Sequence, residues 1–182
     1  LDKALQTFGF KTVLDRHQIS GGEDWQKRLG ALILSADTVV FILSPMSAVS
    51  EICLWEIEEA QRLHKRILPV VAQPLGAAKA PSTLQKLNYM HFYDEPSVPG
   101  SGFGDGIAKL VTALNSDLDW LREHSRLLGL AERWEQGGRN VDRLLTGTEI
   151  AEARQWLKDH PATAPEPTAL QLELIAASEA RA

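Results

Sequence analysis

The chain contains only one cysteine, Cys53, among its 182 residues. Neither an internal disulfide nor a cysteine-based metal site can form from a single thiol, and such sparse cysteine usage fits a reducing, cytoplasmic setting. The histidines do not show the spacing of a metal site either; they are His17, His64, His91, His124 and His160. We therefore expect a protein without disulfides or a bound metal.

Long apolar runs and an excess of positive charge are also missing. No run of about 18 apolar residues occurs, so we expect no membrane-spanning segment, and no signal peptide is recognisable. The formal net charge is -5, from 19 Lys and Arg against 24 Asp and Glu. Because binding to nucleic acid phosphates needs clustered Lys and Arg, this balance argues against nucleic acid as a partner.

The two ends of the chain lie inside helical patterns. Leu1, Ala4, Leu5 and Phe8 recur at helical spacing, and Gly9 follows them as glycine follows the end of a helix. The last residues show another Ala-rich helical pattern. We therefore expect a fragment of a larger protein, fused by analogy to further C-terminal modules.

Strands alternate with helices over the first 114 residues. The expected strands are residues 11–15, 39–44, 66–72 and 90–94, and the expected helices are 25–35, 48–65 and 103–114. The strand at 39–44 is apolar on consecutive residues, which is typical of a parallel strand covered on both faces. Right-handed crossovers then place helices on both sides of the sheet. We predict a flavodoxin-like three-layer α/β domain over residues 1–114, with four of five strands present.

The composition changes after about residue 115. A Leu, Arg and Glu-rich helical stretch at 117–136 ends at two glycines, and a second helix is expected at 148–160. Residues 161–167 are rich in Pro and Ala. We predict a C-terminal helical extension at 115–160, then a Pro-rich tether and the start of a further helix at 161–182.

One carboxylate falls on the apolar side of the helix expected at 48–65. At 100° per residue, the apolar members of this side are Val49, Ile52, Cys53, Ala60 and Leu63. Glu56 falls near the middle of the same side, whereas Glu51 and Glu58 point to solvent. Since a carboxylate is costly to bury unless it is paired, this position singles out Glu56.

Two interpretations of Glu56 follow from its position. It lies within about two turns of the helix start, near the edge where parallel strands end and where open sheets bind ligands. It can also accept hydrogen bonds from Ser44, Ser47 or loop amides and hold the helix in place. The pattern alone favours neither a functional nor a structural role.

The residues around this helix resemble the Toll/interleukin-1 receptor (TIR) family. Phe41–Ser47 followed by Ser50–Ile57 is similar to the family's central strand and next helix, with a serine after the strand and then Ser, Cys and Glu in the helix. Asp15 to Trp25, with Gly21 and Gly22, resembles the loop between the second strand and second helix. The resemblance is of bacterial style, covers roughly residues 1–114, and implies that the family's first strand is not among them.

The resemblance implies a signalling or defence module and an enzymatic activity. Many family members hydrolyse NAD and release nicotinamide, and the essential glutamate of the family maps onto Glu56. NAD would be a substrate rather than a bound cofactor. Residues that the resemblance places near NAD are Asp15, Gly21, Gly22, Trp25, Ser44, Ser47 and Cys53. One departure is Ile52, which stands where many members have Trp.

Structural roles compete with these assignments. Ser47 is favoured as a helix cap, Cys53 as a small core residue and Trp25 as packing for the helix at 25–35. Other family members, chiefly receptor adaptors, act by self-association without catalysis, so the fold does not decide the function. Leu54 and Trp55 point away from the sheet side and are a candidate surface for such assembly.

Two other classes of α/β protein fit less well. A phosphate-receiver domain would need an acidic residue at the end of the central strand, where this chain has Ser44. A nucleoside deoxyribosyltransferase also uses a glutamate on a similar sheet and remains a minor enzymatic alternative. The main contest is between an NAD-cleaving enzyme and a non-catalytic interaction module.

Overall fold

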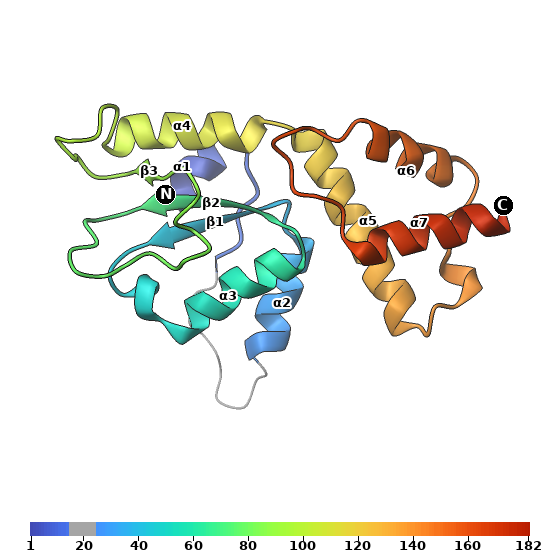
Figure 1. Ribbon diagram of the computed structural model, residues 1–182. Helices are drawn as coiled ribbons and strands as arrows, with labels where there is room; N and C mark the ends of the chain where they lie inside the picture. The colour runs from blue at the N-terminus through green and yellow to red at the C-terminus, as the bar shows by residue number, and fades with distance from the viewer. Residues whose placement is uncertain (15–24) are drawn as a thin grey trace.

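A computed structural model describes residues 1–14 and 25–182. It shows a parallel sheet between two layers of helices, with further helices at one side of the sheet (Figure 1). The strands are β1 (Thr38–Leu43), β2 (Arg66–Val71) and β3 (Met90–His91). The α-helices are α1 (Asp2–Thr7), α2 (Trp25–Ser35), α3 (Glu51–Arg62), α4 (Phe103–Asn115), α5 (Leu118–Gln136), α6 (Thr148–Lys158) and α7 (Ala169–Arg181), and the 3-10 helices are η1 (Ser47–Val49) and η2 (Val141–Arg143).

The sheet has the order β1-β2-β3 and is parallel throughout. β1 pairs with β2 along its whole length, from Thr38 opposite Arg66 to Leu43 opposite Val71. The connection between these two strands runs through α3, which is the βαβ unit expected from the alternation of strands and helices. The predicted mixed α/β, flavodoxin-like architecture is confirmed.

Alternate residues of the strands enter two different apolar clusters. Val40, Leu68 and Val70 pack with residues of α1 and α4, whereas Phe41 and Leu43 pack with residues of η1 and α3. Figure 1 shows α1 and α4 together on one side of the sheet and α2 and α3 on the other. Burial on both faces explains the consecutive apolar residues of β1, and each fully buried side chain of this kind contributes about 1.5–3 kcal/mol.

The strand expected at residues 11–15 is not present in the described part of the chain. Residues 11–14 form neither helix nor strand, and Val13 and Leu14 are 62% and 46% exposed; Asp15 lies outside the described residues. In the flavodoxin-like order 2-1-3-4-5 the second strand pairs with the first and not with the third. None of the described residues supplies that partner, so the sheet has three of the four expected strands.

Helices α5, α6 and α7 share one apolar core. Trp120 of α5 and Trp156 of α6 stack with their ring centroids 4.8 Å apart, and each indole N–H donates to the other residue's carbonyl oxygen, at 3.0 and 3.1 Å. Leu174 and Ile175 of α7 are buried in the same core. Residues 161–167 lead from α6 to α7, which is the further helix expected after the Pro-rich segment. No helix in the described ranges is long and apolar enough to cross a membrane.

His124 is a buried histidine beside this tryptophan pair. His124 is 2% exposed, and its Nε2 atom has no hydrogen-bond partner among residues 1–14 and 25–182. Burial, with smaller contributions from the positive charges of Lys65 and His64, lowers the pKa of His124 to about 3. The folded protein therefore holds this imidazole neutral.

We expect the free energy of unfolding to depend on pH through His124. Between pH 6.5 and 3 the unfolded chain binds a proton at His124 and the folded chain does not. Protonation of His124 therefore does not affect the free energy of unfolding above pH 6.5, and it lowers that free energy by up to ~1.4 kcal/mol for each pH unit below 6.5. Urea unfolding of the wild-type protein and of His124→Leu at several pH values measures the difference. Equal slopes for the two proteins between pH 6.5 and 4 would contradict this assignment.

Candidate functional site

Two serines build a tight turn at the carboxyl end of β1. The backbone N–H of Ser44 donates to the Ser47 hydroxyl at 2.9 Å, and the backbone N–H of Ser47 donates to the Ser44 hydroxyl at 3.2 Å. The Ser47 hydroxyl also donates to the Ile42 carbonyl oxygen at 2.9 Å. Both side chains thus hold the chain as it leaves the sheet, and this is their role among the described contacts.

The cap of α3 is Ser50 and not Ser47. The Ser50 hydroxyl accepts a hydrogen bond from the Cys53 backbone N–H at 3.4 Å, which satisfies one of the free amides at the helix start. Residues 47–49 form the separate 3-10 helix η1. Val49 therefore lies outside α3 and is 70% exposed, which corrects its expected place on the apolar stripe.

Glu56 lies on the same side of α3 as its buried residues. The stripe consists of Ile57, Ala60 and Leu63, which are at most 2% exposed, and Glu56 is half-buried. Because successive residues are 100° apart, Glu56 falls between Leu63 and Ala60 on this stripe, which is the position expected from the sequence. Glu56 takes part in a non-covalent interaction of its own, as a half-buried carboxylate requires.

Cys53 is half-buried one turn before this stripe. It packs against the cluster that contains Phe41, Leu43 and Ile57, and its thiol is free. This is the structural alternative expected from the sequence, in which cysteine acts as a small apolar residue. A contact between Cys53 and NAD stays a prediction.

Trp25 joins α2 to α3. Its ring meets that of Trp55 edge to face, with centroids 5.2 Å apart and an interplanar angle of 78°. Trp55 also packs on the cluster of Ile33, Ala60 and Leu63, and both Leu54 and Trp55 are half-buried, so assembly through these two residues stays a prediction. Trp25 thus has the expected packing role; Gly21 and Gly22 lie outside the described residues.

A polar and aromatic group at the carboxyl end of β3 escaped the sequence analysis. The rings of His91 and Tyr93 are 5.7 Å apart, the Tyr93 hydroxyl donates to Glu95 at 3.3 Å, and the Ser97 hydroxyl donates to Glu95 at 2.8 Å. Hydrogen bonds from Ser97 lower the pKa of Glu95, and burial raises the pKa of Tyr93. The signal was available, because aromatic and acidic residues follow the last strand directly.

The parallel strands bring these groups to one edge of the sheet. The Ser44–Ser47 turn follows β1 and the His91–Tyr93 pair follows β3, and parallel strands have their carboxyl ends at the same edge. α3 starts near this edge, and Glu56 lies five residues into it, about 7.5 Å along its axis. In the described ranges no group of three His, Cys, Asp or Glu residues is arranged to hold a metal ion.

Comparison with known proteins identifies one family. A family model described as TIR domain matches residues 1–111, which span the sheet, α1 to α3 and most of α4. No curated protein and no solved structure matches the chain. The match ends before α5, so the helical extension lies outside it.

Substituting Ser47 with alanine should destabilise the turn after β1. The change removes the acceptor of the Ser44 N–H and the donor to Ile42, so we expect a loss of about 1–2 kcal/mol in the free energy of unfolding. Ser35→Ala is the matched control, because the exposed Ser35 hydroxyl makes one local bond to Leu32. Urea denaturation compares the two, and equal losses would contradict the role of Ser47.

Proposed function

The chain belongs to the TIR-domain family, and on this premise we propose that it cleaves the N-glycosidic bond of NAD with Glu56 as the key carboxylate. The observation that supports this proposal is the placement of Glu56. It is a half-buried acid on the second turn of α3, beside the edge where the strands end and where open parallel sheets bind ligands.

The chemistry of this reaction suits a single carboxylate. The bond between ribose C1′ and the nicotinamide nitrogen breaks, and its electron pair leaves with nicotinamide as a neutral molecule. The positive charge that develops on the ribose resembles an oxocarbenium ion, which a nearby anion stabilises. Water then adds to C1′ and releases a proton. Glu56 would bind the ribose hydroxyls, stabilise the charge or accept the proton from water.

The serine turn and the β3 group would complete the binding site. Ser44 and Ser47 offer hydroxyl groups at the end of β1, and Tyr93 offers a hydroxyl at the end of β3. Hydroxyl groups of this kind suit the ribose and phosphate oxygens of a dinucleotide. In this proposal NAD is the substrate, and self-association of TIR domains activates its cleavage.

Glu56→Gln should lower nicotinamide release from NAD by about 10²-fold or more, since the amide keeps the shape of the side chain but cannot stabilise a cation. Nicotinamide release is measured by chromatography of the reaction mixture. The protein is kept at high concentration or under crowding so that it self-associates. Glu58→Gln is the matched control, because Glu58 is an exposed acid of the same helix and its loss should leave the rate unchanged.

Two outcomes would reject the enzymatic proposal. One is a wild-type rate equal to that of Glu56→Gln under crowding and under forced assembly. The other is equal loss in Glu56→Gln and Glu58→Gln, because that result would point to a general charge effect on α3 and not to a specific carboxylate.

An exposed apolar pair favours a second function, that of an interaction module. Met46 and Val49 are 80% and 70% exposed and lie on either side of Ser47 in the turn after β1. Large apolar side chains with this exposure are typical of partner surfaces. Assembly through this turn would also bring a second copy next to the proposed site.

Replacing both residues by lysine should weaken self-association. Two positive charges in place of two apolar side chains remove the apolar contact and add repulsion between copies, so we expect the dimer dissociation constant to rise about tenfold or more. Sedimentation analysis at several concentrations measures this constant. Leu172→Lys is the control, because Leu172 is an exposed leucine of α7; equal effects would show that the turn is not the contact.

A further inference from the structure

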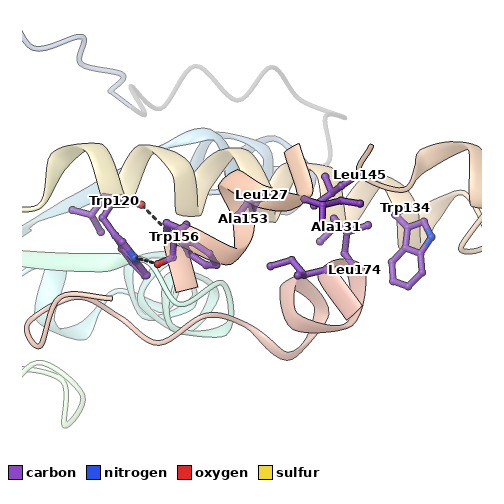
Figure 2. Packing of buried hydrophobic residues seen from close by; sticks show 11 residues of the cluster. Trp120, Leu127, Ala131, Trp134, Leu145, Ala153, Trp156 and Leu174 are labelled. Atoms are coloured by element: carbon purple, nitrogen blue, oxygen red, sulfur yellow. Dashed lines mark hydrogen bonds between the residues drawn. The ribbon is translucent and has the colours of Figure 1, made fainter. Parts of the chain in front are cut away.

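The helical extension has an apolar core of its own. Figure 2 shows its members packed between α5, α6 and α7, with the paired hydrogen bonds of Trp120 and Trp156 at one end. This cluster is distinct from the clusters that pack on the two faces of the sheet. A segment with a separate core retains its own packing when its contacts with neighbouring segments change.

The extension meets the TIR domain along a narrow contact, which we call the seam. Here α5 packs against α2, and Leu128 of α5, which is 1% exposed, enters the cluster of Ile33, Ala60 and Leu63. Leu128 is absent from the core of the extension. One buried leucine therefore provides the apolar anchor of the seam.

Polar contacts surround this anchor. The Lys65 ammonium donates to the Ser125 hydroxyl at 3.0 Å, and that hydroxyl lies 3.1 Å from the Ala36 carbonyl oxygen after α2. Arg62 forms an ion pair with Glu132 at 3.6 Å. His64 Nδ1 donates to a backbone carbonyl oxygen of the segment before α7 at 2.7 Å. These contacts connect α5 and the start of α7 with the ends of α2 and α3.

The seam borders an open groove. This groove, of about 260 Å³, lies between the end of α3, α5 and the start of α7, and its wall includes Arg62, His64 and Glu132. Lys65 is 5% exposed, and desolvation lowers its pKa to about 8. His64 has a φ of 50°, which is uncommon outside glycine. Contacts between segments that are largely polar are where proteins open locally.

The seam acts on the same helix that carries Glu56. Leu63 follows directly on α3, seven residues after Glu56, which corresponds to about 10 Å along a helix. The seam also holds α2, whose Trp25 packs on Trp55, the neighbour of Glu56 in the chain. The end of α3 thus contacts α5 through Leu63 and Arg62, in addition to the sheet and α2.

We propose that α5–α7 form a separable module whose docking on α2 and α3 holds α3, and with it Glu56, in the position required for reaction. The proposal rests on the function proposed above, because it names how that site is regulated. Leu128 is then a positioning residue, which acts through Leu63 and Ala60. Undocking leaves the sheet and the tryptophan core folded and loosens the helix between them.

The first experiment measures hydrogen exchange in the full chain. Leu128→Asp should speed amide exchange about tenfold or more in the last turns of α2 and α3, while the exchange of the Trp120–Trp156 region stays as in the wild type. Leu172→Asp on the exposed side of α7 should change neither. Lys65→Met, which removes the hydrogen bond from Lys65 to Ser125 across the seam, should speed exchange in the same turns to a smaller extent. This variant replaces Leu128→Asp in the test if Leu128→Asp does not fold.

The second experiment measures NAD cleavage by the same variants. Leu128→Asp should lower kcat about tenfold or more with little change in KM, since a displaced Glu56 loses contacts made in the transition state, and Leu128→Met should restore the rate. If Leu128→Asp raises amide exchange in the Trp120–Trp156 region as much as in α2 and α3, α5–α7 are not a separable module. Loosened helices with an unchanged kcat would overturn the coupling. If the wild type cleaves no NAD, the proposed function and its coupling to the seam both fail. The hydrogen-exchange experiment then still tests whether α5–α7 dock as a separable module.

Discussion

The parallel pairing of β1 with β2 around α3 is the constraint on which the other parts of this TIR domain depend. The six-residue register from Thr38 opposite Arg66 to Leu43 opposite Val71 aligns the alternation of side chains on the two strands. One set of apolar residues then meets α1 and α4, and the other meets α3. The same pairing puts the carboxyl ends of the strands at one edge, where the serine turn and the start of α3 lie.

α3 links the two functional proposals because each end of it meets a different part of the molecule. Its first turn follows Ser50 beside the carboxyl edge of the sheet, and its last residues meet Leu128 and the polar contacts of the seam. A helix is stiff over this length, so a contact at one end bears on a side chain near the other.

Local patterns predicted the elements well where their signals were strong. The helix expected at 25–35 is α2 with the same bounds, and the strand at 39–44 is β1 shifted by one residue. The errors lie where a distant partner decides the outcome. Residues 11–14 have strand-forming side chains but no paired strand in the described chain, and Trp55 is half-buried because its ring packs against Trp25 of α2.

The key residue of the candidate site was predictable from the sequence, whereas the exact start of its helix was not. Glu56 was singled out by helical periodicity, and the family match over residues 1–111 supports the fold around it. The Ser50 cap starts α3 at Glu51, three residues later than the helix expected at 48–65, and leaves Val49 outside it. Glu56 keeps its place on the buried stripe, between Leu63 and Ala60.

The sequence by itself determined the layers of this protein, since apolar period and element length are local properties of neighbouring residues. The tertiary structure alone decided the seam, because its contacts join residues far apart in the chain. Lys65 meets Ser125 sixty positions later, and His64 meets the segment before α7 one hundred and two positions later. A local sequence pattern does not predict contacts between residues so far apart. These contacts form only when the two separate cores pack against each other.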